Sequence, residues 1–496
     1  MAERKRNYWQ LARRRISSDI ETLRFVGGSY ANVIIVIAVA IGTALGSHLM
    51  EPFNSILVWT GLAGAILAVP LKGGVVLMRM RSGSLGERST ERAQLGNPFQ
   101  HELTAAWPSS QPVIEKSQLS NSAWSTYFWH DDEVNEELRK YRLPIGSRES
   151  QHAVMATLRA NDYSLPPLLD LIAPRIMWRS GLKRDENGWW SRFKNRPVKF
   201  NGKLVRLATE PTASQLRQGS LQLQKVRYFD GECSNEAWRF MLNTKNAGIE
   251  PSQDFMTGFV FNNHQRIKAL HESEAANIIG VTILAVTSDG YAVLIQQPKN
   301  QAVAAEHYSA TGSGSVNHEN LSGYIAARTD TRRIRLFRLR SKLRLISVDD
   351  LDDTDIDFLE LVWESMYARM SAESAIDNIA PGIQESRAAT VDEYSFRCTG
   401  YFRWMSRAAK PEFSGLVKLK LTKQEVLRRF QQTATVDSDG DEPRFIAVND
   451  LVQVFKAEGA SRMLAQLRTQ MSPSSEHTVV RAVEYMSCHP EWLAQS

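Results

Sequence analysis

The sequence predicts an α+β protein that carries an N-terminal two-helix transmembrane hairpin. Two uncharged apolar stretches near the start of the 496-residue chain predict the hairpin. Farther along, apolar and polar residues alternate as in β-strands, and helical segments interrupt these strands in no regular order. Regular alternation of strand and helix is typical of a parallel α/β sheet, so its lack favours the α+β class.

The predicted hairpin covers residues 25–80 and follows a basic segment over residues 1–24. Each uncharged stretch holds about 20 residues, which as a helix cross roughly 30 Å of hydrocarbon. Both are apolar on all sides, unlike a surface helix, and a cleaved signal peptide is not followed at once by a second span. The alternative is a buried helical hairpin of a large soluble core.

The charges that flank the hairpin predict its orientation. Lys and Arg residues precede the first stretch and follow the second, whereas the turn between the stretches has neither. The positive-inside rule then predicts a multi-pass protein of the inner (cytoplasmic) membrane with both termini in the cytoplasm. Gly42 and Gly46 have the spacing that allows close helix packing, either within one hairpin or between copies, and we expect a homo-oligomer in the lipid bilayer.

Composition narrows the class of the remaining chain. Hydrophobic residues make up 43% and charged residues 23%, as in folded domains rather than disordered or fibrous chains. The 3 cysteines lie far apart and form no CxxC pair, which argues against a disulfide scaffold or a cysteine-rich zinc site. The net charge of +6 permits anionic partners without specifying one.

The cytosolic part is predicted to contain four segments. Residues 81–121 are rich in Ser, Gly, Pro and Gln and indicate a linker. Residues 122–274 mix helical and strand patterns, residues 275–435 form the main α+β domain, and residues 436–496 form a helical tail.

The main domain opens with two β-rich runs, IIGVTILAVT and YAVLIQQ, which Ser-Asp-Gly joins in a predicted hairpin. A glycine-bearing loop, SATGSGSV, contains Gly312 and Gly314. A helix is expected from about Phe358 to Ser374, and a further hairpin comprises FRCTGYFRWM and SGLVKLKLT.

This order of strands, glycine loop and helix over residues 275–430 resembles a Nudix domain. The resemblance implies that glutamates one turn apart on the helix bind the Mg²⁺ that polarises a diphosphate and activates water. In the best alignment, Ala368 and Arg369 occupy the positions of the paired glutamates. The resemblance then implies a degenerate domain that binds phosphates without a metal and without hydrolysis. In a shifted alignment, Glu360 and Glu364 share one helix face and are the alternative catalytic pair, with Mg²⁺ as cofactor.

A two-helix hairpin fused to a degenerate Nudix-like domain resembles the membrane effectors of bacterial (CBASS-type) antiphage systems that signal with cyclic oligonucleotides. The resemblance implies that the soluble domain senses a cyclic nucleotide and that the hairpin disrupts the membrane. We expect the ligand to contact Gly312, Gly314, Arg369, Arg403 and Trp404.

Two other functions remain open. One is a membrane-tethered Nudix hydrolase that acts on a nucleoside diphosphate derivative, and the other is a membrane scaffold that binds no nucleotide. The basic run over residues 332–344 is compatible with nucleic-acid binding, but the acidic segment over residues 349–357 is its favoured partner. No DNA or RNA polymer is therefore expected as a ligand.

Overall fold

The computed structural model describes the chain in separate ranges, and every structural statement concerns these ranges. They are residues 85–87, 113–118, 125–141, 154–159, 161–167, 169–170, 173, 201–236, 240–242, 267–296, 308–318, 321, 355–374, 390–404, 407–433, 443–456 and 471–494. The chain divides into two compact units, the first comprising residues 1–87, 164–202 and 227–257, and the second the rest.

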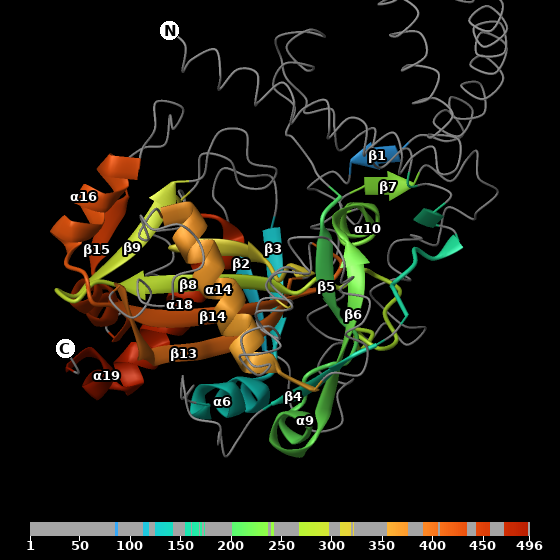
Figure 1. Ribbon diagram of the computed structural model, residues 1–496, viewed down its shortest axis with the longest axis horizontal. Helices are drawn as coiled ribbons and strands as arrows, with labels where there is room; N and C mark the ends of the chain where they lie inside the picture. Colours follow the sequence, from blue (N-terminus) through green and yellow to red (C-terminus); the bar gives the residue numbers. More distant parts are fainter. Residues whose placement is uncertain are drawn as a thin grey trace, which may run out of the picture. The chain divides into compact units, whose positions relative to one another are not determined.

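A nine-stranded mixed sheet forms the centre of the second unit (Figure 1). Its path runs β10-β9-β8-β14-β13-β3-β2, while β11 pairs with β8 and β15 pairs with β9. The bounds are β2 (Val113–Gln118), β3 (Ser125–His130), β8 (Gly280–Val286), β9 (Tyr291–Gln296), β10 (Tyr308–Ser309), β11 (Gly312–Ser315), β13 (Val391–Trp404), β14 (Lys410–Leu419) and β15 (Arg444–Ala447). The pair of β8 with β14 is parallel. The predicted hairpin between β8 and β9 is confirmed, and its turn places Gly290 at φ 83°, where glycine is favoured.

Two helices cover opposite faces of this sheet: α14 (Phe358–Ser374) and α18 (Pro473–Cys488). A Cβ on Gly415 of β14 would lie 2.5 Å from the Met366 sulfur of α14, so this position faces α14. The next residue, Leu416, belongs to the cluster that α18 covers. Because successive strand residues point to opposite faces, the sheet lies between the two helices. Figure 1 shows α14 crossing in front of β8 and β14.

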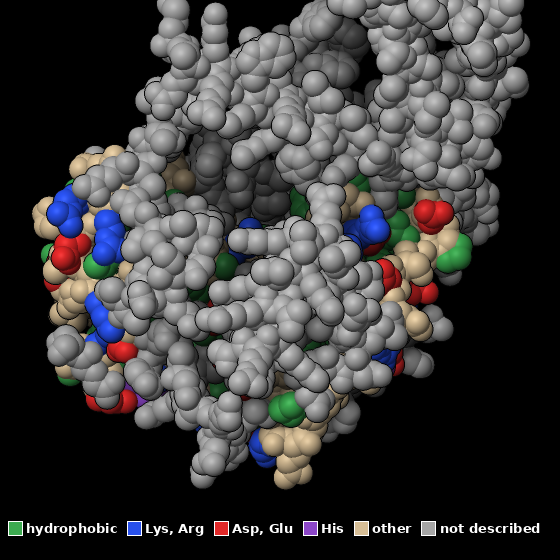
Figure 2. All heavy atoms as spheres, viewed as in Figure 1, with side chains coloured by type: hydrophobic (Ala, Val, Ile, Leu, Met, Phe, Trp, Pro, Cys, Tyr) green, Lys and Arg blue, Asp and Glu red, His purple; other side chains and the backbone are tan. Residues whose placement is uncertain are grey.

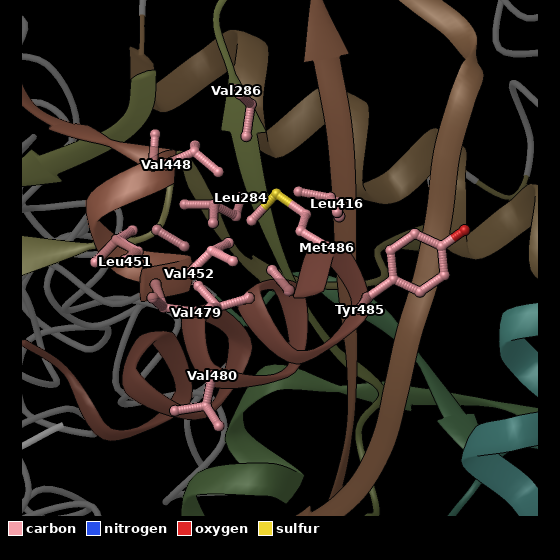
Figure 3. Close-up of a cluster of buried hydrophobic side chains, with 14 of the residues drawn as sticks. Leu284, Val286, Leu416, Val448, Leu451, Val452, Val479, Val480, Tyr485 and Met486 are labelled. Atoms are coloured by element: carbon pink, nitrogen blue, oxygen red, sulfur yellow. The ribbon is translucent and has the colours of Figure 1, made fainter. Parts of the chain in front are cut away.

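An apolar core lies between the sheet and α18. Figure 3 shows side chains from β8, β14, α18 and the helical residues 448–456 meeting in one cluster. The labelled members are Leu284, Val286, Leu416, Val448, Leu451, Val452, Val479, Val480, Tyr485 and Met486. Each fully buried aliphatic side chain stabilises the fold by about 1.5–3 kcal/mol, so this cluster fixes α18 on the sheet.

A smaller four-stranded sheet in the second unit has the order β12-β4-β6-β5. Its bounds are β4 (Met155–Leu158), β5 (Lys203–Leu207), β6 (Ser220–Arg227) and β12 (Asp355–Asp357). β5 connects this sheet to the large one, since Val205 N donates to Val316 O at 3.1 Å and Ile279 N donates to Val205 O at 3.0 Å.

The shorter helices of the second unit are α6 (Asp132–Lys140), α9 (Ala213–Gln218), α16 (Lys423–Thr433) and α19 (Pro490–Ala494). The first unit contains β1 (Leu85–Glu87) paired antiparallel with β7 (Phe240–Leu242), and α10 (Tyr228–Cys233). Strands β1 and β2 fall within residues 81–121, for which the sequence predicts a linker.

The predicted transmembrane hairpin requires a correction. Within the described ranges, no helix is both long enough and apolar enough to cross a bilayer. The longest, α14 and α18, have 17 and 16 residues, whereas a span needs about 20. Residues 25–80 themselves lie outside the described residues. The fold class is therefore corrected to mixed α and β with sheets and no transmembrane hairpin shown, and the predicted inner-membrane localisation is withdrawn.

Candidate functional site

Helix α14 packs directly onto the glycine strand β11. A Cβ on Gly312 would lie 2.4 Å from the Met370 backbone nitrogen, and one on Gly314 would lie 2.5 Å from Arg369 Nε. Real Cβ contacts are not this short. At Gly312 the atoms met belong to the helix backbone, so the close approach of helix and strand requires glycine there, whereas at Gly314 they belong to the Arg369 side chain that lies over the strand. The structure therefore brings together three of the five predicted ligand residues: Gly312, Gly314 and Arg369.

The Arg369 side chain lies over this strand, next to Gly314 and Ser315. Its side chain is half-buried, and its Nη2 donates a hydrogen bond to the Ser315 carbonyl oxygen at 3.0 Å. Within the described residues, no carboxylate pairs with this guanidinium. A fixed guanidinium with free donors is a chemical group that recognises phosphate.

The alternative catalytic pair, Glu360 and Glu364, lies on the other side of α14. Both belong to a half-exposed stripe, whereas the side chains that face the sheet are buried. The stripe consists of Glu360, Glu364, Tyr367, Ala368 and Ser371. In the described part of the chain, no group of three or more His, Cys, Asp or Glu side chains could hold a metal ion.

Arg403, by contrast, is buried in an ion pair. Its guanidinium is 1% exposed, and Nη1 donates to Glu210 Oε2 at 2.5 Å. The Tyr401 hydroxyl donates to the other carboxylate oxygen of Glu210 at 2.7 Å. Burial, with the negative charge of Glu210, raises the pKa of Tyr401 well above its ordinary value. Strands β8 and β14 separate β13, which carries Arg403, from β11, so the structure does not join Arg403 to the Arg369 site.

Trp404 faces the other side of the sheet and is 5% exposed. The Arg407 guanidinium lies over its ring, 4.8 Å from the centroid. A nucleobase would need this ring face for stacking, and Arg407 already covers it. On the same face, the ring of Phe402, two residues earlier in β13, packs against His477 with centroids 4.1 Å apart. The geometry thus gives Trp404 a packing role.

The surface near α16 and β15 carries mixed charges. On the face shown in Figure 2, Lys and Arg side chains alternate there with Asp and Glu. Lys423 Nζ lies 4.8 Å from the centroid of the Tyr291 ring and 5.4 Å from that of Phe445. These cation–π contacts occupy both aromatic rings within the domain itself.

Sequence reasoning did not identify Glu210 as the partner of Arg403. The two residues lie 193 positions apart, and Glu210 appears in the sequence as part of an ordinary Glu-Pro-Thr turn. No local spacing signals such a pair.

Neither the models of known protein families nor the curated proteins give a match to this chain.

Proposed function

We propose that this chain binds a nucleotide through Arg369 on the glycine strand β11 and does not hydrolyse it. The observation that carries the proposal is the half-buried Arg369 guanidinium, which has no carboxylate partner among the described residues. The sequence resemblance supplies the ligand class, a cyclic oligonucleotide.

The chemistry of Arg369 suits a phosphate. A guanidinium has five N–H donors, and the Ser315 carbonyl uses one that belongs to Nη2. The close packing of α14 on two glycines restricts the stem of the side chain, so less conformational freedom is lost on binding. Charge-assisted hydrogen bonds to phosphate oxygens are about twice as strong as neutral ones.

The residues at positions 368 and 369 argue against hydrolysis of the bound nucleotide. The resemblance places Ala368 and Arg369 where a Nudix hydrolase carries metal-binding glutamates. A methyl group offers Mg²⁺ no oxygen ligand, and a guanidinium repels the ion. A sensor also benefits from keeping its signal intact.

The second candidate is a hydrolase that uses Glu360 and Glu364. One observation favours it: both side chains lie on the same half-exposed stripe of α14, four residues apart, and could approach one Mg²⁺. This candidate predicts Mg²⁺-dependent turnover that Glu364→Gln abolishes.

A role in antiphage signalling rests on the resemblance alone. In that role, the bound nucleotide is the signal, and the ligand shifts the protein toward the state that it binds more tightly.

The site is tested by titrating the protein with a panel of cyclic di- and trinucleotides. We expect Arg369→Gln to raise the dissociation constant at least about tenfold, since a charge-assisted hydrogen bond contributes about 1.5–3 kcal/mol. Arg217→Gln is the matched control, because Arg217 is an arginine of α9 with a 56% exposed side chain. Equal affinities in Arg369→Gln and Arg217→Gln would place the ligand elsewhere.

A further inference from the structure

Arg206 of β5 is another buried arginine, and among the described residues its hydrogen bonds go to neutral groups. It is 8% exposed, and its Nη1 donates to Gln224 Oε1 at 2.7 Å while its Nη2 donates to the Ser273 carbonyl at 2.8 Å. The guanidinium lies 5.1 Å from the centroid of the Tyr163 ring. Its buried Nε has no hydrogen-bond partner in the described part of the chain.

A charged side chain that is buried among neutral hydrogen-bond partners is unusual. Burial lowers the pKa of this guanidinium, and the positive charge of Arg159 lowers it further. Arg403, which is buried in the same unit, has the Glu210 carboxylate as counter-ion. A buried cation without such a partner is unfavourable unless an anion compensates it. Within the described residues no carboxylate pairs with Arg206, and a bound anion would compensate its charge.

An exposed arginine lies beside this buried charge. Arg159 follows β4 directly, and its Nη2 donates to Gln222 Oε1 on β6. Gln222 and Gln224 lie two positions apart on one strand and so share a face of the sheet. This face therefore carries an exposed guanidinium at Arg159 and a buried one at Arg206.

We propose that this face of the four-stranded sheet binds the phosphate group of a small ligand, with Arg159 in direct contact. The buried charge of Arg206 attracts the same phosphate, and the low dielectric around a buried group strengthens the interaction. The amides of Gln222 and Gln224 hold the two guanidinium groups in place. This site lies on different elements from Arg369 and does not depend on the function proposed above.

The probe is inorganic phosphate, compared with chloride at equal ionic strength, and the readout is the midpoint of urea unfolding. The experiment uses the full-length Arg369→Gln variant, so that the first site makes no contribution. Phosphate should raise the midpoint because a ligand that binds only the folded state stabilises it. Adding Arg159→Gln should weaken the apparent phosphate affinity at least about tenfold. Adding Arg444→Gln, at the exposed first position of β15, should leave it unchanged.

Arg206→Met should also abolish the phosphate effect. If that variant does not fold, the comparison of Arg159→Gln with Arg444→Gln decides alone. The proposal is overturned if phosphate shifts the midpoint no more than chloride does, or if Arg159→Gln keeps the full shift.

Discussion

Replacing Glu210 by glutamine should lower the free energy of unfolding by about 3–5 kcal/mol. The Glu210 carboxylate accepts three hydrogen bonds, from Arg403 Nη1 at 2.5 Å, from the Tyr401 hydroxyl at 2.7 Å and from Leu270 N at 3.1 Å. The side chains of Arg403 and Glu210 are 1% and 4% exposed. Glutamine preserves the shape but removes the charge, which leaves the Arg403 cation buried without a counter-ion and places an amide donor among three donors.

Urea unfolding followed by circular dichroism measures this loss. The control is Arg217→Gln, which breaks an ion pair to Glu137 whose arginine is 56% exposed and should cost only about 0–1 kcal/mol. The double variant Glu210→Met with Arg403→Met should recover much of the loss, because it removes both buried charges together. If Glu210→Gln costs no more than Arg217→Gln, the reasoning about the buried pair is refuted.

Three other predictions concern backbone packing, pH and thiol reactivity. Gly312→Ala should lower the free energy of unfolding by about 1–3 kcal/mol in the same urea assay, since its Cβ would meet the α14 backbone. Gly202→Ala is the control, because nothing lies within 4 Å of its Cβ, and it should change this free energy by no more than about 0.5 kcal/mol. Equal losses in the two variants would contradict the close packing. Thr422, which precedes α16, donates hydrogen bonds from its backbone N and its hydroxyl to the Glu425 carboxylate and lowers its pKa. The contribution of Glu425 to stability is therefore fully present above pH 4.5, the ordinary pKa of the group, and is lost as the pH falls through its lower pKa in the folded state. Glu425→Gln should therefore flatten the acid limb of unfolding free energy against pH, and an unchanged limb would disprove the linkage. Burial raises the pKa of the Cys398 thiol to about 12, so iodoacetamide should label exposed Cys488 in the native protein and spare Cys398, as read by peptide mass spectrometry; labelling of both at similar rates would show that Cys398 is accessible.

Local patterns predicted the elements of the main domain well. The expected helix from about Phe358 to Ser374 coincides with α14. The turn at Ser288-Asp289-Gly290 is correct because a glycine with positive φ closes the β8–β9 hairpin. The second hairpin is also present, as β13 and β14. Each of these features depends only on residues near one another in the sequence.

Features that depend on distant residues were not predictable in this way. The parallel pair of β8 and β14 joins Gly280 with Glu412, and periodicity carries no information on which strands pair. Arg403 was predicted to contact a ligand, yet its charge is neutralised by Glu210 from a turn far along the chain. Arg206 was not predicted to be a site residue, because an arginine in a strand pattern is usually exposed. Only the structure shows that it is buried.

Hydropathy alone does not distinguish two interpretations of the apolar stretches over residues 25–80. Length and apolarity predicted a transmembrane hairpin, but the same pattern is also typical of a helix buried on all sides. The longest helices of the described part, α14 and α18, have buried apolar residues together with half-exposed polar ones, which is the pattern of helices that pack on a sheet.

The most direct test of the proposed function is to recover the nucleotide after binding. The full-length protein is incubated with Mg²⁺ and a panel of cyclic oligonucleotides and nucleoside diphosphate derivatives, passed through a filter that retains protein, and both fractions are chromatographed. We predict that one cyclic oligonucleotide is retained by the wild-type protein, is released intact on denaturation, and is lost from Arg369→Gln. Conversion of any nucleotide to new products, abolished by Glu364→Gln, would contradict the account and identify a hydrolase.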